Sequence, residues 1–211
     1  PDYEIPKDSG LDNIYNITVQ VSDGELTATQ EIVVTATPVN DNAPIITSLP
    51  SINVAENLSS VITVTAADSD LPIQSLTYSI TGGADSSLFS INASTGELTF
   101  ISAPDYEIPK DSGLDNIYNI TAQVSDGEFS AVQEIVVTVT PVNDNAPVIT
   151  SSSNISIPEN TTAVTIVSAK DADLPAQPLT YAIVSSADAS KFAINKDTGI
   201  LTFITAPDYE V

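Results

Sequence analysis

The chain has 211 residues, with 28 acidic side chains against five basic ones and a formal net charge of −23. A polyanion of this kind is repelled by nucleic acid and by anionic membranes, so neither is an expected partner. The chain has no Cys and no His, which excludes disulfides, thiolate zinc sites and histidine-based catalysis. No apolar run approaches the roughly 20 residues of a membrane-spanning helix, so no span is expected in this segment.

An internal repeat organises the whole chain. The tetrapeptide Pro-Asp-Tyr-Glu begins at Pro1, Pro104 and Pro207, at intervals of 103 residues. When the sequence is shifted by 103 residues, 74 of the 108 aligned positions are identical without a gap. Such similarity between neighbours is typical of a tandem array, so we expect a much larger parent protein with many such units.

The boundaries between units are predicted at two copies of Asn-Asp-Asn-Ala-Pro, which end at Pro44 and Pro147. A proline cannot donate a hydrogen bond to a sheet, and it forces the preceding residue into an extended conformation. We therefore predict the C-terminal part of one repeat in residues 1–44, a complete repeat in 45–147 and the N-terminal part of a third in 148–211. The chain thus starts and stops inside a repeat, with about two strands in its first part and about five in its last.

In the complete repeat, apolar and polar side chains alternate at every second position, which indicates strands. The expected strands, in chain order, cover residues 45–54, 61–66, 76–80, 89–91, 98–100, 118–124 and 135–139. Val, Ile, Thr and Tyr dominate these runs, and polar turns rich in Gly, Asn and Ser separate them. Seven short strands without a helix in about 100 residues predict an all-β fold, a tandem of immunoglobulin-like Greek-key sandwiches.

The acidic residues of the complete repeat cluster near the predicted ends of strands. Asp68 and Asp70 close the second strand, Asp105 and Glu107 flank a tyrosine, and Asp126 ends a later strand. Alternate residues of an extended segment point the same way. The pair Asp68 and Asp70 and the pair Asp105 and Glu107 can therefore each present two carboxylates together. Carboxylates gathered without bases repel one another, and the simplest compensation is a hard divalent cation with oxygen ligands, namely calcium.

The order of the motifs resembles that of a cadherin repeat. Their amino-acid sequences are most similar to prokaryotic cadherin-like repeats of large surface or secreted adhesins. The matching motifs are Ala55-Glu56-Asn57 and Pro158-Glu159-Asn160, Asp68-Ser69-Asp70 and Asp171-Ala172-Asp173, Asp105-Tyr106-Glu107 with copies at Asp2 and Asp208, Val124-Ser125-Asp126-Gly127, and Asn143-Asp144-Asn145-Ala146-Pro147 with a copy at Asn40. Each motif alone is weak, but five in the family's order, twice over, are specific. The resemblance covers the whole chain and implies immunoglobulin-like sandwiches with about three calcium ions in each junction between repeats.

The resemblance also implies the ligands of two junctions. In the first junction they are Asp2, Glu4, Asn40, Asp41, Asn42, Asp68, Asp70 and Asp126. In the second they are Glu56, Asp105, Glu107, Asn143, Asp144, Asn145, Asp171 and Asp173. The pattern recurs at Glu159, Asp208 and Glu210, which are expected to be metal ligands as well.

The sequence departs from the family pattern in three places. Pro38 and Pro141 stand where the family linker usually has Asp, so the middle calcium is expected to bind more weakly or to take water instead. Ala55 replaces the usual Pro, which is a minor change. Vertebrate adhesive members of the family exchange a strand anchored by Trp, and this chain has no Trp.

Other interpretations compete with the calcium sites. Loop acids are often merely solvated, but seven of the 13 acids in the complete repeat fall on family ligand positions. The loop 111–116 could bind a further ion, although a polar turn also favours Asp, Gly and Asn. Paired carboxylates also catalyse glycoside hydrolysis, which needs an aromatic-lined cleft, whereas aromatic residues make up only 6% of the chain. We therefore expect no enzyme.

The expected function is that of a calcium-rigidified spacer or stalk in a long extracellular or cell-surface adhesin or filament. Its expected partners are neighbouring repeats or copies of itself joined head-to-tail, with a cell-surface or glycan partner elsewhere in the full protein. One alternative is an adhesive recognition module that binds itself or a glycan. A second alternative is a filament subunit whose half-repeats complete each other. Near-identical neighbouring repeats favour the spacer, since binding domains tend to be singular.

Overall fold

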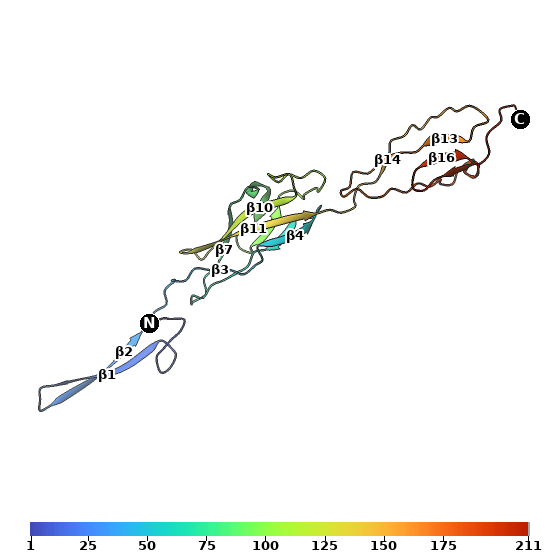
Figure 1. Ribbon diagram of the computed structural model, residues 1–211. Coiled ribbons are helices and arrows are strands. Elements are labelled where there is room, and N and C mark those ends of the chain that lie inside the picture. The colour runs from blue at the N-terminus through green and yellow to red at the C-terminus, as the bar shows by residue number, and fades with distance from the viewer. Residues whose placement is uncertain (211) are drawn as a thin grey trace. The chain divides into compact units, whose positions relative to one another are not determined.

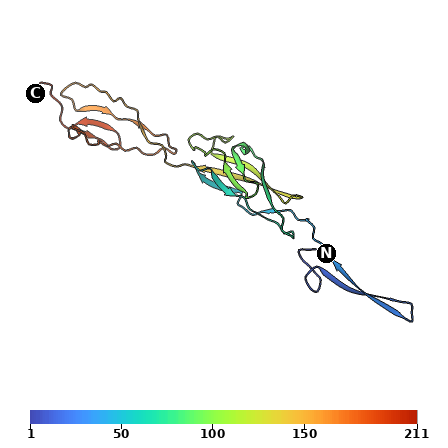
Figure 2. The same ribbon diagram turned by 180° about the vertical axis from the view of Figure 1, so that it is seen from behind.

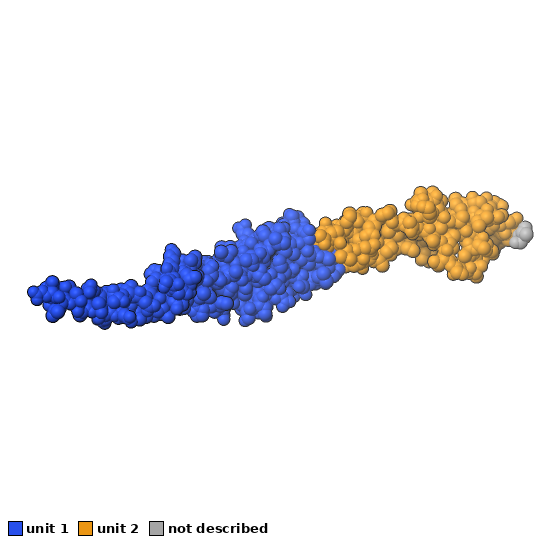
Figure 3. All heavy atoms as spheres, turned by 90° about the horizontal axis from the view of Figure 1, so that it is seen from below, with its two compact units in different colours: residues 1–104, 109–139 blue, residues 105–108, 140–211 orange. Residues whose placement is uncertain are grey.

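A computed structural model of the chain describes residues 1–210, and Val211 lies outside the described residues. The described chain consists of sixteen strands and two single-turn 3-10 helices. It divides into two compact units, coloured in Figure 3. Unit 1 holds residues 1–104 and 109–139, and unit 2 holds residues 105–108 and the described residues from 140 onward. None of the described residues belongs to a helix that is long and apolar enough to cross a membrane.

Unit 1 begins with a hairpin of two long strands, β1 (Ile14–Ser22) and β2 (Thr27–Thr35), at the blue end of the ribbon in Figure 1. The strands pair in antiparallel register over their whole length and form a two-stranded sheet of their own. Asp23 closes the turn between them, because its side chain accepts the N–H groups of Glu25 and Leu26 at 3.0 and 2.7 Å. These are the two strands expected in residues 1–44.

The complete repeat is a sandwich of antiparallel sheets, as predicted. Its strands are β3 (Ile45–Ile46), β4 (Ser51–Ala55), β5 (Ser60–Thr63), β6 (Ala66–Ala67), β7 (Thr77–Gly82), β8 (Phe89–Ile91), β9 (Glu97–Phe100), β10 (Ile117–Ser125) and β11 (Ser130–Thr140). One sheet has the order β4-β11-β10-β7, the other has the order β5-β9-β8, and β3 pairs with β6. Two predicted strands are each divided, 45–54 into β3 and β4 and 61–66 into β5 and β6. A one-turn helix, η1 (Ser86–Leu88), was not expected from the sequence.

The core of the repeat lies between these sheets. The inward-facing side chains of β10 and β11 are at most 2% exposed, namely Tyr118, Ile120, Ala122, Val124, Ile135, Val137 and Val139. Phe89 and Phe100 of the opposite sheet pack edge-on against Tyr118, with ring centroids 5.9 and 5.2 Å from the tyrosine ring. Burial of such side chains stabilises the fold by roughly 1.5–3 kcal/mol each. The hairpin of β10 and β11 supplies seven of the twelve buried apolar side chains among the described residues.

A buried carboxylate ties a loop to the core hairpin. Asp85 is 2% exposed, and it accepts the backbone N–H groups of Ser112 and Asn119, each at 2.7 Å. Ser112 belongs to the loop before β10, and Asn119 belongs to β10 itself. The carboxylate thus satisfies two backbone donors that no strand partner reaches, which explains why an acid is tolerated inside the sandwich.

The acidic loop 111–116 is also held by its own carboxylate. Asp111 is 1% exposed and accepts the N–H groups of Asp115 and Asn116 at 3.0 and 2.9 Å. Desolvation alone would raise the pKa of Asp111, but these hydrogen bonds hold it below its usual value. The carboxylate already has donors, which favours the turn interpretation of this loop over a further ion site.

We expect Asp85→Ala to destabilise the complete repeat by about 2–4 kcal/mol, because two hydrogen bonds to a charged acceptor are lost and two N–H groups lose their partner. Asp188 is the matched control, since it stands 103 residues later, its side chain is 65% exposed and it forms an ion pair with Lys191 at 3.1 Å. Asp188→Ala should change stability by less than about 0.5 kcal/mol. Urea unfolding followed by tyrosine fluorescence measures both values, and equal losses would contradict the role given to Asp85.

Unit 2 repeats the front of this sandwich, as the view from behind in Figure 2 also shows. Its strands are β12 (Val148–Ile149), β13 (Ala163–Ile166), β14 (Ala169–Lys170), β15 (Phe192–Ile194) and β16 (Ile200–Phe203), with a one-turn helix η2 (Ala189–Lys191). β12 pairs with β14, and the other three form a sheet in the order β13-β16-β15. These are the five strands expected after residue 147.

Candidate metal centres

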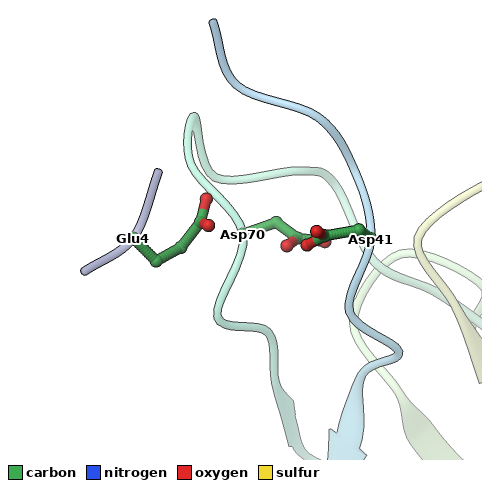
Figure 4. A group of neighbouring side chains, drawn as sticks. All are labelled: Glu4, Asp41 and Asp70. Carbon is green, nitrogen blue, oxygen red and sulfur yellow. The ribbon is translucent and has the colours of Figure 1, made fainter. Parts of the chain in front are cut away.

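Five carboxylates of unit 1, from four separate segments, form two overlapping groups. Each group has ligand oxygens within 4.8 Å of one another, and the groups are Glu4, Asp41 and Asp70, and Asp68, Asp70 and Asp126. Asp70 belongs to both and is only 1% exposed. Figure 4 shows the carboxylates of Glu4, Asp41 and Asp70 directed toward a common region. Within the part of the chain that the structure describes, no lysine forms an ion pair with these acids, so the groups concentrate negative charge.

The linker residue Asn42 holds two of these acids in place. It donates its backbone N–H to Asp70 at 3.1 Å, and its side-chain amide to Asp70 at 2.6 Å and to Asp41 at 2.8 Å. The amide of Asn42 is the main reason why the pKa of Asp70 lies below its usual value. The pKa of Asp41 is raised, first by desolvation and then by the charges of Asp70 and Glu4. The site therefore favours a fixed negative charge at Asp70 beside Asp41, whose pKa desolvation and then repulsion raise.

Three buried oxygens of the cluster accept no hydrogen bond from the described residues. They are Oδ2 of Asp68, Oδ2 of Asp126 and Oδ1 of Asn40, whose side chain lies beside Asp126. The other carboxylate oxygen is used in each acid, since Oδ1 of Asp68 accepts the N–H of Asp70 at 3.0 Å and Oδ1 of Asp126 accepts two N–H groups at 2.7 Å. A buried acceptor without a donor costs roughly 1–3 kcal/mol. A hard cation satisfies such oxygens, and an all-oxygen set of carboxylates and an amide fits calcium.

The remaining predicted ligands of the first junction differ in placement. Oε1 of Glu4 accepts the backbone N–H of Leu71, the residue after Asp70, at 3.1 Å. Asp2 is exposed and belongs to neither carboxylate group; its side chain accepts the N–H of Ile5 at 3.1 Å. The structure therefore brings the predicted residues of this junction together with the exception of Asp2.

The same contacts recur within unit 2. Asp173 is 1% exposed and accepts the backbone N–H and the side-chain amide of Asn145 at 3.0 and 2.9 Å. The Asn145 amide is the main cause that lowers the pKa of Asp173. Oδ2 of Asp173 is buried without a donor. Oε1 of Glu107 accepts the N–H of Leu174 at 2.9 Å, and Asp171 accepts the N–H of Asp173 at 3.0 Å. Glu107 thus accepts the same hydrogen bond from Leu174 that Glu4 accepts from Leu71.

The linker of unit 2 contains one contact that sequence reasoning missed. Asn143 donates its amide to Oε1 of Gln177 at 2.5 Å. A glutamine stands at the same place in the preceding repeat, and Oε1 of that residue, Gln74, is buried without a donor. In both repeats a Gln stands six residues after the first Asp of the Asp-x-Asp motif, and this recurrence is the sequence signal that could have pointed to the contact. Asp144 accepts the amide of Asn145 at 2.8 Å, next to Asp173.

A third group lies at the C-terminal end of unit 2. Glu159, Asp208 and Glu210 place ligand oxygens within 4.8 Å of one another. Glu159 accepts the N–H of Tyr209 at 2.9 Å, and Asp208 accepts the N–H of Glu210 at 3.1 Å. These acids stand 103 residues after Glu56, Asp105 and Glu107. Asp105 likewise accepts the N–H of Glu107 at 3.1 Å, and Glu56, in unit 1, is 2% exposed.

Comparison with known proteins matches part of this chain to a family model. The profile described as "Cadherin domain" matches residues 50–140. Human Protocadherin Fat 1 is 32% identical over 166 residues, which cover 73% of this chain and 4% of that protein. Human Protocadherin gamma-A10 is 36% identical over 155 residues, which cover 68% of this chain and 16% of that protein. The chain therefore spans only a small part of these two relatives.

A solved structure gives the same result. The cis-dimer structure of Protocadherin gammaB7 EC3-6 is similar to this chain with a TM-score of 0.67 and 28% sequence identity, over 94% of this chain and 53% of the other. The likeness extends well beyond the residues matched by the family profile. The all-β sandwich architecture is thus shared over nearly the whole chain.

Proposed function

Residues 50–140 form a domain of the cadherin family, and on that premise we propose that the chain is a calcium-stiffened spacer within a long adhesion protein. The family consists of extracellular adhesion proteins at the cell surface and not of enzymes, so the extracellular location and the lack of catalysis expected from the sequence agree with it. The special similarity to prokaryotic cadherin-like repeats, expected from the motif sequences, has no support from the two curated relatives named above, which are human.

The observation that carries the proposal is the set of buried, donor-free oxygens on Asp68, Asp126 and Asn40. They lie on three separate segments, and Asp68 and Asp126 converge with Asp70. We assign calcium binding at the first junction to Glu4, Asn40, Asp41, Asp68, Asp70 and Asp126, with Asn42 orienting Asp70. A bound cation neutralises these acids and holds the leading segment, the linker and the complete repeat to one another.

The second junction follows from the repeat. Glu159, Asp208 and Glu210 converge, and their counterparts are Glu56, Asp105 and Glu107. We propose that these counterparts converge likewise and share ions with the linker acid Asp144 and with Asp171 and Asp173. A count of about three ions in each junction, with a weak middle ion because Pro38 and Pro141 replace an acid, belongs to the same proposal.

The proposed mechanism is electrostatic. Without calcium, the carboxylates of a junction repel and the linker between repeats is free to bend. With calcium, each ion binds groups from both sides of the linker and fixes the angle between repeats. Extracellular calcium modules have dissociation constants of roughly 0.1–1 mM, so extracellular fluid fills such sites and cytosol does not. The high identity between successive repeats, 74 of 108 positions, favours this repeated structural role over a single recognition surface.

Calcium titration by calorimetry tests the proposal with Asp126→Asn. We expect this variant to lose about tenfold or more in affinity at the first junction, because its donor-free oxygen becomes an uncharged amide atom. Asp23 is the matched control, since it closes the equivalent turn with the same backbone contacts but belongs to no carboxylate group. Asp23→Asn should bind calcium like the unchanged chain, and equal binding by both variants would refute the assignment.

A further inference from the structure

A short turn of the complete repeat carries the acceptor motif for N-linked oligosaccharides. Asn92, Ala93 and Ser94 form the motif Asn-x-Ser, whose middle residue is not proline. Proteins that pass through a secretory route receive such sugars at Asn-x-Ser/Thr motifs on their surface. This copy lies between β8 and β9, and each of its three residues is exposed. The intact sandwich therefore presents an acceptor to solvent.

The turn is fixed by its own hydrogen bonds. Oδ1 of Asn92 accepts the backbone N–H groups of Ser94 and Thr95 at 2.9 and 3.1 Å. The backbone carbonyl of Asn92 accepts the N–H of Gly96 at 2.9 Å. Gly96 has a φ of +73°, and an added Cβ there would lie 2.2 Å from the carbonyl oxygen of Val64. The packing of this glycine against the backbone holds the turn in one conformation.

This geometry gives the two ends of the Asn92 carboxamide different roles. The oxygen is bound by the backbone of the turn, whereas Nδ2 donates no hydrogen bond to the described residues. Donors at the amide oxygen stabilise the negative charge that develops on the carboxamide when Nδ2 loses a proton. The hydroxyl of Ser94, the third residue of the motif, is also without a hydrogen bond to the described residues. Both groups that define the acceptor are thus accessible to an enzyme.

The other two acceptor motifs of the complete repeat begin at Asn119 and Asn57, and they are held differently. Asn119 lies within β10, its N–H binds Asp85 at 2.7 Å, and the next residue, Ile120, is 1% exposed. That segment cannot enter an enzyme site without leaving the core. Asn57 directly follows Glu56, which is 2% exposed. A turn that can be approached without moving a buried neighbour is therefore specific to Asn92 among these three.

We propose that Asn92 carries an N-linked oligosaccharide. The donor is an oligosaccharide that is joined through its anomeric carbon to a lipid diphosphate. A bond forms between Nδ2 of Asn92 and the anomeric carbon, while the bond from that carbon to the diphosphate oxygen breaks. The lipid diphosphate leaves with the electron pair, and Nδ2 gives one proton to a base of the transferase. The step needs no oxidant or reductant.

The proposal goes beyond the calcium-dependent function and requires only the extracellular location of the family. Asn92 belongs to none of the carboxylate groups. A glycan at this turn and calcium at the junctions are therefore independent properties. Loss of the glycan leaves the carboxylate ligands in place, and loss of calcium binding leaves the acceptor turn in place.

Unit 2 contains a turn of the same geometry that lacks the motif. Oδ1 of Asn195 accepts the N–H groups of Asp197 and Thr198, each at 3.0 Å, and Gly199 has a φ of +70°. Asn195 is exposed like Asn92. Its sequence is Asn-Lys-Asp, so the hydroxyl of the motif is missing. This turn is the matched control, because a single substitution separates it from an acceptor.

Secretion of the full chain from animal cells, behind a cleavable signal sequence, tests the proposal. Enzymatic removal of the sugar in water enriched in heavy oxygen converts a modified Asn into labelled Asp. Cleavage after acidic residues then releases residues 86–97, which hold no other acceptor motif. We expect label at Asn92, loss of the label in Ser94→Ala and its return in Ser94→Thr. Asn195 should carry no label, and Asp197→Ser should introduce it there.

Transfer to the folded chain separates the effect of the turn from that of the motif. Full chain made without sugar is incubated with a purified oligosaccharyltransferase and its lipid-diphosphate donor, beside a short acceptor peptide. We expect modification of Asn92 but not of Asn119 in the folded chain, and of both once the chain is unfolded.

Three results would overturn the proposal. The first is a secreted chain whose Asn92 stays unlabelled. The second is a folded chain that is modified at Asn119 and not at Asn92. The third is a folded chain that stays unmodified while the acceptor peptide in the same reaction is modified. Misfolding does not account for a loss of label in Ser94→Ala, since Ser94 is exposed and its hydroxyl has no partner among the described residues.

Discussion

Removal of calcium with a chelator is expected to lower the melting temperature of the chain on the order of 10 °C. A ligand that binds only the folded state adds RT ln(1 + [L]/Kd), which is about 1.4–2.7 kcal/mol for each site when calcium exceeds a Kd of roughly 0.1–1 mM by 10- to 100-fold. For domains of this size, about 1 kcal/mol corresponds to roughly 4–8 °C. The donor-free oxygens of Asp68 and Asp126 mark where this stabilisation acts.

Differential scanning calorimetry in 10 mM calcium and in excess chelator, both at fixed ionic strength, measures the shift. The fixed ionic strength is needed because salt alone screens a chain with a net charge of −23. Magnesium at the same concentration is the control, since its small octahedral shell suits these carboxylate groups less well. Coincident melting curves in calcium and in chelator would remove the basis for the metal sites.

Two substitutions are expected to distinguish the role of the junction from that of the sandwich core. Tyr118→Ala is expected to destabilise the complete repeat by about 3–5 kcal/mol, because the ring is 2% exposed and packs against Phe89 and Phe100. Asp144→Ala is expected to cost less than about 1 kcal/mol of stability in chelator, since Asp144 lies in the linker and outside the sandwich core. It should nevertheless weaken calcium binding at the second junction, and with it the coupling between repeats.

Urea unfolding in chelator and calcium titration measure these two properties separately. We expect Tyr118→Ala to move the unfolding midpoint and Asp144→Ala to move the calcium affinity. A collapse of the complete repeat in Asp144→Ala, as large as that in Tyr118→Ala, would show that the linker acid is a folding residue. The account of the junction would then be wrong.

The sheet architecture followed from alternation in the sequence because one face of each strand is buried. Tyr118, Ile120, Ala122 and Val124 follow one another at every second position, and each is at most 2% exposed. Strand ends were less predictable. The predicted strand 45–54 is broken in two, because Ile45 and Ile46 pair with β6 whereas residues 51–55 join the sheet of β11. Alternation indicates which face is buried, but it does not indicate which neighbour a strand pairs with.

The candidate metal residues came from motif order, and the structure adds what each one contacts. Asp70 and Asp68 look alike in sequence, yet Asp70 is fixed by the amide of Asn42 whereas Asp68 keeps an oxygen without a donor. Asp85 and Asp188 occupy the same place in two repeats, and only Asp85 is buried, because its donors come from a hairpin far along the chain. Such contacts depend on tertiary neighbours, and no local pattern encodes them.

Small-angle X-ray scattering of the full chain, with calcium and then with chelator, tests the central claim most directly. If calcium stiffens the junctions, the curve in calcium fits a single arrangement of the units, and chelator broadens the distribution of distances within the molecule. Asp126→Asn and Asp144→Ala should behave in calcium as the unchanged chain does in chelator. The comparison is made at concentrations where sedimentation shows monomers, so that association of copies does not contribute. Superimposable curves with and without calcium would contradict the proposed function.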